Sequence, residues 1–298
     1  MSELFDEMRR ILVPTWIGPN QATAPSVDMG WGRIFGGQLL GQATAVAQDH
    51  KSSRGHLHSL HAHFVASGDV QAPVTYHLYP VRNGRTYSTF RVEAGQNEQL
   101  IAHAFLSFQQ AEDGLSHRSE MPEVPAPDSL PSYQQTLQAM VAGLPEQRRS
   151  AISPLWLKRL YQQPAFDVRP VYPTNFLTLD GDKPERMLWF RTTHPLPDDP
   201  DIHQQALIWI SDFPMLGTAL QPHQIPPTSR QVKLTSLDHS MWFYNPFRAD
   251  QWLLCAIHSP ISGSGRGMTI AQIFRQDGVM VAVCTQEGMM RLRPPDRL

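Results

Sequence analysis

The feature that most constrains this chain is a stretch of sequence that occurs twice at a constant separation. Ser59 in HSLHAHF and Ser236 in TSLDHSMWF lie 177 residues apart, and so do Gln109 and Gln286. Between each serine and its glutamine, strand-like runs and turns follow one another in the same order. A constant separation of this kind predicts a duplicated structural unit, so the fold must contain the same module twice.

The first copy opens with a helix-like segment at 31–49 that is rich in small residues, among them Gly36, Gly37 and Gly41. Glycine inside a helix costs up to about 1 kcal/mol relative to alanine, so tertiary packing must offset that cost. We expect a curved sheet to enclose this helix, because small side chains let strands approach its backbone closely.

Strands complete both copies. Runs rich in strand-forming residues, separated by Asn-Gly, Asp-Gly and other polar turns, are typical of antiparallel hairpins. In the first copy they predict strands at 57–65, 74–82, 85–94 and 100–110. In the second copy they predict strands at 187–196, 231–243, 252–260, 267–276 and 279–293, with a helix at 202–221 interrupted near Pro214.

The segment between the copies has a different composition. Its proline-rich stretch MPEVPAPDSLPS excludes regular helix and central strand, and a helix is expected after it at 133–144. We therefore expect an N-terminal unit at 1–111, a connecting segment at 112–173 and a C-terminal unit at 174–298. The first residues, MSELFDEMRRILVP, predict a short amphipathic helix rather than a secretion signal.

Four stretches carry a resemblance to a known family: FGGQLLGQA, SDFPMLGTALQPH, SLDHSMWFYNPFRADQWLL and QDGVMVAVCTQEGMMR. From about residue 30 to residue 291, the chain resembles the type II acyl-CoA thioesterase family. The resemblance implies an α+β double hotdog, in which each of two repeats wraps a long helix in a curved antiparallel sheet. It also implies hydrolysis of fatty acyl-CoA to fatty acid and CoA, without a metal or an organic cofactor.

The resemblance further implies a catalytic set of an aspartate, a hydroxyl residue and a glutamine, which falls on Asp212, Ser236 and Gln286. The aspartate would act as general base, and the hydroxyl and amide would fix the attacking water. Backbone N–H groups at the start of the helix after Asp212 would suit an oxyanion.

Each of the three residues also has a purely structural interpretation. Asp212 beside Pro214 is a good helix cap, Ser236 could be an ordinary strand serine, and a buried Gln286 could serve only as a structural amide. In the first copy, Ser59 and Gln109 hold the equivalent positions, but Phe35-Gly36 stands opposite the aspartate. The first copy is therefore expected to lack the chemistry.

The chain departs from the family at one point. Ala66-Ser67 stands where relatives commonly carry an arginine-proline pair, so the contact made by that arginine is not expected here. The CoA phosphates should meet basic side chains, for which Arg33, Arg85, Arg230 and Arg266 are among the candidates.

Composition and spacing exclude several other classes. The net charge of −2 and pI of about 6.7 argue against a nucleic-acid partner. No apolar run is long enough for a membrane span, so we expect a cytoplasmic protein, and the resemblance suggests a homodimer or homotetramer. His56, His58, His61 and His63 do not share one strand face, which argues against a metal site, and Cys255 and Cys284 are expected to be small buried hydrophobes.

Two alternative functions remain open from the sequence. One is an acyl-thioester hydratase or dehydratase of the hotdog class, which would rely on an acid–base pair such as Asp238-His239. Adjacent strand residues point to opposite faces, so a structural role suits this pair better. The other is a non-catalytic acyl-CoA binding protein that kept the fold and lost the chemistry.

Overall fold

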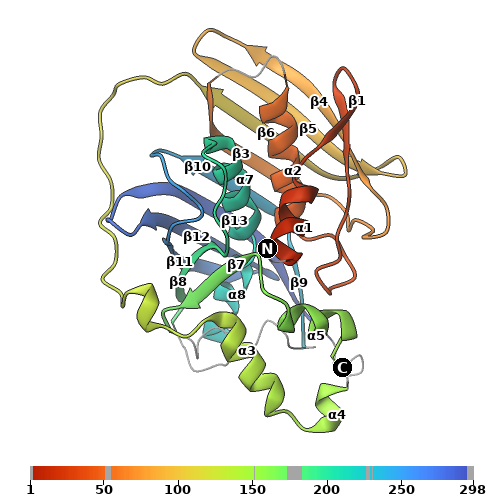
Figure 1. Ribbon diagram of the computed structural model, residues 1–298, viewed down its shortest axis with the longest axis vertical. Coiled ribbons are helices and arrows are strands. Elements are labelled where there is room, and N and C mark those ends of the chain that lie inside the picture. The colour runs from red at the N-terminus through yellow and green to blue at the C-terminus, as the bar shows by residue number, and fades with distance from the viewer. Residues whose placement is uncertain are drawn as a thin grey trace.

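A single antiparallel sheet runs through both copies of the repeat (Figure 1). The computed structural model describes residues 3–50, 55–150, 152–172, 183–225, 229 and 231–293. The strand order within these residues is β1-β2-β4-β5-β6-β3-β10-β13-β12-β11-β8-β7, and β9 also pairs with β13. The first copy supplies β1 (Thr15–Gly18), β2 (Gln21–Ala24), β3 (His56–Phe64), β4 (Val74–Asn83), β5 (Tyr87–Gln96) and β6 (Gln99–Gln109). The second supplies β7 (Phe166–Pro170), β8 (Glu185–Thr192), β9 (Val232–Ser236), β10 (Asp238–Phe243), β11 (Leu253–Gly263), β12 (Arg266–Arg275) and β13 (Met280–Leu292).

The two copies join at the middle of the sheet, where β3 pairs with β10. Their antiparallel register places Asp238 opposite His63 and Trp242 opposite Ser59. On either side, the strands follow in matching order, β6-β5-β4 in the first copy and β13-β12-β11 in the second. The duplicated helix-plus-sheet architecture expected from the sequence is confirmed.

The helices lie against this sheet and around its ends. They are α1 (Glu3–Ile11), α2 (Gly36–Asp49), η1 (Pro127–Ser129), α3 (Tyr133–Ala142), α4 (Glu146–Arg149), α5 (Pro154–Tyr161), α7 (Pro200–Ser211), α8 (Met215–Leu220) and η2 (Gln221–His223). Helix α2 contacts β3 to β6, whereas α8 contacts β11 to β13. The predicted interruption near Pro214 is the break between α7 and α8. No helix within the described ranges is long and apolar enough to cross a membrane.

The small residues of α2 have a different partner from the one expected. Gly37 and Gly41 face α7, a helix of the other copy, rather than strands. A Cβ on Gly37 would lie 2.1 Å from the carbonyl oxygen of Trp209, and one on Gly41 would lie 3.6 Å from that of Gln205. These glycines therefore allow two helices from different copies to pack closely, which offsets their low helix propensity.

The segment predicted as one strand at 231–243 is two strands. Leu237 interrupts it: its N–H donates to the carbonyl oxygen of Glu287, and its own carbonyl oxygen accepts from Phe64. As a result β9 pairs only with β13, whereas β10 lies between β13 and β3. The short elements β1, β2, β7, α4 and α5 were not predicted from the sequence.

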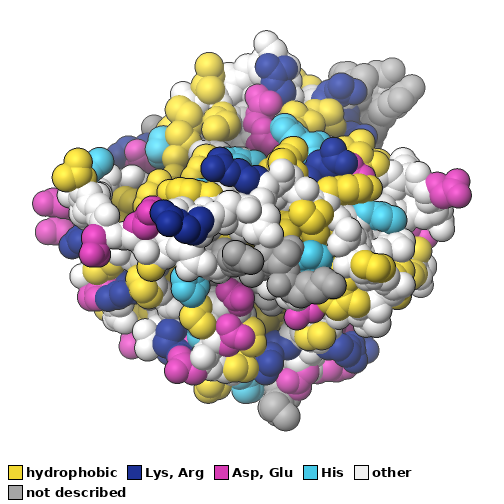
Figure 2. Space-filling view, turned by 90° about the horizontal axis from the view of Figure 1, so that it is seen from above, with side chains coloured by type: hydrophobic (Ala, Val, Ile, Leu, Met, Phe, Trp, Pro, Cys, Tyr) yellow, Lys and Arg dark blue, Asp and Glu magenta, His cyan; other side chains and the backbone are white. Residues whose placement is uncertain are grey.

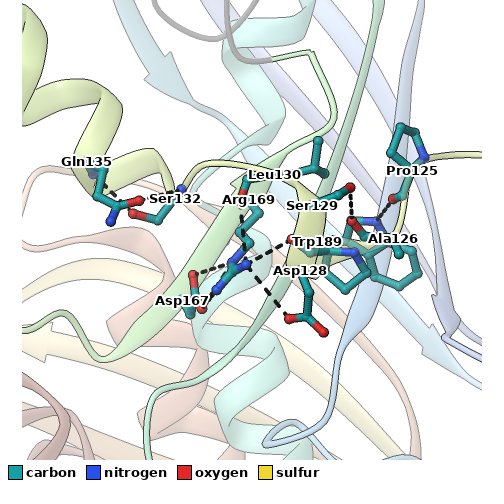
Figure 3. A network of polar contacts seen from close by, with 11 residues as sticks. Pro125, Ala126, Asp128, Ser129, Leu130, Ser132, Gln135, Asp167, Arg169 and Trp189 are labelled. Atoms are coloured by element: carbon teal, nitrogen blue, oxygen red, sulfur yellow. Dashed lines mark hydrogen bonds and ion pairs between the residues drawn. The ribbon is translucent and has the colours of Figure 1, made fainter.

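The connecting segment lies over the outer face of the second copy. Met121, Val124 and Leu130 pack on a cluster that includes Trp189 and Trp252. Arg169 on β7 holds this packing in place, because it donates to the carbonyl oxygen of Pro127 at 2.9 Å. Figure 3 shows that the same guanidinium group also pairs with Asp167 and Asp128. In the same view, Trp189 Nε1 donates to the carbonyl oxygen of Pro125.

The expected helix of this segment is α3, and it begins at a capping box between Ser132 and Gln135 (Figure 3). Strand β7 falls within the range 112–173 but pairs with β8 at the edge of the sheet. The division into 1–111, 112–173 and 174–298 stays a prediction. On the face seen in Figure 2, Lys and Arg side chains lie among acidic, histidine and hydrophobic ones.

Candidate active site

Asp212, Ser236 and Gln286 meet in one polar cluster. The amide nitrogen of Gln286 donates to Asp212 Oδ1 at 2.7 Å and to Ser236 Oγ at 2.7 Å. The three side chains come from the end of α7, the end of β9 and the middle of β13. Gln286 is completely buried, whereas Asp212 and Ser236 are half-buried. A carboxylate, a hydroxyl and a carboxamide are thus within hydrogen-bonding distance of one another.

Strand pairing fixes two members of this cluster. Ser236 lies opposite Gly288 in the β9–β13 pair, two residues from Gln286 along β13. Gln286 lies opposite Thr269 in the β12–β13 pair, and Thr269 Oγ1 donates to the carbonyl oxygen of Gln286 at 3.1 Å. The sheet register, rather than any local motif, therefore brings the serine and the glutamine together.

Asp212 does not cap the helix that follows it. It is the residue after the last turn of α7, and the first residue before α8 is Pro214, which makes no side-chain cap. Its Oδ2 instead accepts from the backbone N–H of Gly37 at 3.0 Å, at the start of α2 in the first copy. The helix N-terminus that faces the carboxylate is thus that of α2, and the interpretation of Asp212 as a cap of the helix that follows it is wrong.

Gly36 leaves room for this arrangement. A Cβ at Gly36 would lie 2.7 Å from Asp212 Oδ2 and 2.8 Å from Phe64 Cζ. The sequence contains the signal for this contact in the Phe-Gly-Gly start of α2. Sequence reasoning assigned those glycines to strand packing and missed their place beside the carboxylate.

The environment of Asp212 favours its protonated form more than water does. Burial raises the pKa of Asp212 above its ordinary value. Hydrogen bonds from Gln286 and Gly37, the positive charge of Arg33 and a hydrogen bond with Ser236 act in the opposite direction but do not cancel this effect. A carboxylate with a raised pKa is a stronger base once ionised, which suits proton abstraction.

The oxygen of the Gln286 amide is an unused acceptor in this cluster. Its nitrogen donates both protons to Asp212 and Ser236, whereas its buried Oε1 has no partner among the described residues. Buried carbonyl oxygens are nearly always hydrogen-bonded, so one without a partner calls for a functional explanation.

A second buried cluster supports the end of α7. His239 Nε2 lies 2.9 Å from Ser211 Oγ and 3.2 Å from Cys284 Sγ. Ser211 Oγ donates to the carbonyl oxygen of Ile208, so its contact with His239 requires the ring nitrogen to be the donor. Burial lowers the pKa of His239 to about 4, and the ring is therefore neutral near pH 7.

Asp238 and His239 do not act as a pair. Asp238 Oδ1 accepts from the backbone N–H of Glu287 at 2.8 Å, whereas the His239 ring is buried on the other face of β10. This confirms the structural interpretation of these adjacent residues.

The other candidates lie apart from the cluster. Gln109 donates to Glu112 at 3.3 Å and lines a separate groove, and Ser59 is buried on β3. His61 contacts Ser240 at 3.2 Å, and no three His, Cys, Asp or Glu side chains gather as a metal site within the described ranges. Both cysteines are buried and free, and burial raises the pKa of each thiol.

The structure also shows the surroundings of Ala66, where the chain departs from the family, and of the basic side chains considered as contacts for the CoA phosphates. Ala66 donates its backbone N–H to the carbonyl oxygen of Ile101 and packs against the core. Arg33 is exposed and close enough to Asp212 to affect its pKa, and Arg266 pairs with Glu287 at 2.9 Å. Arg230 lies outside the described residues.

Comparison with known proteins links this geometry to one family. Residues 162–289 match the family model described as acyl-CoA thioesterase, and residues 24–109 match the model of an acyl-CoA thioesterase N-terminal domain. The chain is 36% identical to acyl-CoA thioesterase 2 of Haemophilus influenzae over 293 residues, which cover 98% of this chain and 99% of that protein.

Solved structures of two other proteins are also similar to this chain. An acyl-CoA thioesterase II from Mycobacterium marinum matches with a TM-score of 0.78 and 34% identity, over 97% of this chain and 99% of the other. A hot dog fold protein from Alicyclobacillus acidocaldarius matches with a TM-score of 0.76 at 19% identity, over 97% of this chain and 99% of that chain. The second match concerns the fold alone.

Proposed function

This chain belongs to the acyl-CoA thioesterase family, and on that premise we propose that Asp212, Ser236 and Gln286 carry out the hydrolysis. The protein is a thioester hydrolase that acts on acyl-CoA. The observation that carries the assignment of residues is the Gln286 amide, which bridges the carboxylate and the hydroxyl. Fatty acyl groups as the preferred substrates are part of the proposal.

In the proposed reaction, a water molecule lies between the three side chains. Asp212 takes one proton from this water, while the Gln286 amide holds the Asp212 carboxylate and the Ser236 hydroxyl in place by its two hydrogen bonds. Ser236 orients the water through its hydroxyl. The water oxygen then attacks the thioester carbonyl carbon, and the carbonyl oxygen becomes an oxyanion.

The start of α2 is the proposed oxyanion site. The first N–H groups of a helix have no partner within the helix, and the helix dipole favours negative charge there. The N–H of Gly37 is taken by Asp212, so the N–H of Gly36 is the donor that we assign to the oxyanion. Collapse of the intermediate breaks the C–S bond, and the proton held by Asp212 passes to the leaving sulfur to give free CoA and the carboxylic acid.

Replacement of the proposed base tests this assignment. Asp212→Asn should lower turnover by about two to four orders of magnitude, the usual scale of general-base loss. The measurement is release of free thiol from acyl-CoA, with Asp113→Asn in the exposed connecting segment as a matched control. Normal turnover in Asp212→Asn would rule out the assignment. A hydratase or a binding protein would release no thiol in the unmodified enzyme.

The assembly and location of the protein remain predictions. A homodimer or homotetramer is expected and can be measured by light scattering coupled to size-exclusion chromatography. The cytoplasmic location also stays a prediction. If the enzyme needs no cofactor, it should keep full activity after treatment with a chelator and exhaustive dialysis.

A further inference from the structure

An apolar cavity of about 190 Å³ is lined in part by residues that neighbour Asp212 and Gly36 in the chain. Its walls come from α1, α3, α5, β7, α7 and the loop before α2, and most of the lining side chains are aliphatic or aromatic. The aromatic part is continuous: Phe35 packs edge-on against Trp209 at 5.0 Å, and Trp209 stacks on Phe166 at 5.5 Å.

The cavity adjoins the polar cluster along the chain. Ile210 lies two residues before Asp212, and Phe213 follows Asp212 directly. Both of these side chains line the cavity. Phe35 also lines it and directly precedes Gly36, where an ideal Cβ would lie 2.7 Å from Asp212 Oδ2. The chain segments that carry Asp212 and Gly36 therefore also form part of the wall of this apolar cavity, which makes it the candidate site for a hydrocarbon chain.

Two other cavities suit an acyl chain less well. One of about 330 Å³ is lined mainly by polar side chains, among them Asp167, Arg169 and Arg191. The other, of about 1060 Å³, contacts α7 near its start, at His203 and Gln204. Helix rise places these residues roughly 13 Å from Asp212 along α7.

We propose that the acyl chain of the substrate lies in the 190 Å³ cavity and that α1, α3 and α5 select its length. This inference rests on the proposed function. The three helices (Glu3–Ile11, Tyr133–Ala142 and Pro154–Tyr161) all lie outside the residues that match the family models, 24–109 and 162–289. In this proposal the chemistry lies in the residues matched by the family models, whereas the chain-length selectivity lies in helices outside those matches.

The wall formed by these helices is held in place. Arg159 on α5 donates to Glu7 on α1 at 2.7 Å and 3.4 Å, and both residues line the cavity. Leu137 on α3 also lines it, whereas Met140 on the same helix is 40% exposed and does not. This pair of residues gives a matched test within one helix.

The test compares kcat/KM for butanoyl-CoA and dodecanoyl-CoA in Leu137→Trp, Leu137→Ala and Met140→Trp. Because each buried methylene is worth about fourfold in kcat/KM, Leu137→Trp should lower the dodecanoyl-to-butanoyl ratio by at least about tenfold. Leu137→Ala, which enlarges the cavity, should extend the accepted chain length and so shift the dodecanoyl-to-butanoyl ratio in the opposite direction to Leu137→Trp. Met140→Trp should change the ratio by less than about twofold, as expected of a surface site.

The outcomes separate this inference from the proposed function. Equal loss for both substrates, or no change in the ratio in either Leu137 variant, would overturn the acyl-cavity assignment. Asp212→Asn, assayed in parallel, should lower the rates for both chain lengths alike. If Asp212→Asn stayed active while the Leu137 variants changed the ratio, the cavity assignment would stand and the catalytic assignment would fall.

Discussion

At the scale of single residues, Gly36 is a point at which the first copy closely approaches the Asp212 carboxylate of the second copy in the proposed site. Its missing side chain leaves space for Asp212 Oδ2 and Phe64, at 2.7 and 2.8 Å from an ideal Cβ. The two glycines that begin α2 signal a close approach, but nothing in the sequence pairs them with the carboxylate, which lies in the other copy. By contrast, the choice of Asp212, Ser236 and Gln286 as the candidate set came from the resemblance to the family motifs, which does not depend on coordinates.

The Gly36 contact predicts a large effect from one methyl group. Gly36→Ala should displace the Asp212 carboxylate and lower kcat by about tenfold to a hundredfold, the scale of a small misplacement of a catalytic group. Gly114→Ala is the matched control, because nothing lies within 4 Å of its ideal Cβ. Thiol-release kinetics measure the effect, and unchanged kcat in Gly36→Ala would show that the carboxylate position is not critical.

The electrostatics of Asp212 predict the acid side of the pH–rate profile. A general base must be ionised, and burial raises its pKa, so kcat/KM should fall with decreasing pH through a pKa above the ordinary value of 3.8. Arg33 lowers this pKa through its positive charge. Arg33→Gln should therefore move the acid limb to higher pH, whereas Arg85→Gln, on the exposed end of the β4–β5 hairpin, should not. An acid limb that stays in place in Arg33→Gln would argue against Asp212 as the titrating base.

At the scale of elements, the local sequence was sufficient to predict a strand wherever alternating apolar and polar residues were bounded by turn residues. The Asn83-Gly84 turn and the Asp277-Gly278 turn both connect predicted strands, and Pro214 marked the break between α7 and α8. Strands β1 and β2 were missed because four residues are too few to show the alternation of apolar and polar side chains that marks a strand. The packing of α2 on α7 was missed for a different reason: helix propensity reports on a segment and not on its partner.

The pairing of α1 with α5 predicts a stability effect from one ion pair. Glu7 and Arg159 have side chains only 23% and 13% exposed and make two hydrogen bonds. Arg159→Met leaves the Glu7 carboxylate without its partner and should lower the free energy of unfolding by about 1–3 kcal/mol. Urea denaturation measures this loss.

The matched control for that variant is Arg149→Met. Its ion pair with Glu146 is longer, at 4.0 Å, and more exposed, at 43% and 86%. Exposed pairs of this kind contribute about 0–1 kcal/mol, so the control should lose much less. Equal losses in the two variants would mean that the α1–α5 contact is no stronger than a surface pair.

At the scale of the whole molecule, the polar cluster draws on both copies of the repeat. The carboxylate, the hydroxyl and the amide all come from the second copy, whereas the helix N-terminus that receives the carboxylate comes from the first. The first copy keeps Ser59 and Gln109 in equivalent positions but has no aspartate at the matching point. The proposed site therefore needs both copies: the second supplies the three side chains, and the first supplies the N–H group of Gly37 that holds the carboxylate.

This mutual dependence predicts that the two copies stay together when the chain between them is cut. Leu115 is fully exposed and Gly114 has no near neighbour, so a protease site inserted at 114–116 should cost little stability. After cleavage, the β3–β10 pairing and the packing of α2 on α7 should hold both fragments in one folded particle. We expect them to co-elute in size-exclusion chromatography and to keep most of their thiol-release activity, because every group in the polar cluster remains in place. Uncleaved protein with the same insertion is the control, and fragments that separate under native conditions would show that the connecting segment, rather than the shared sheet, joins the two copies.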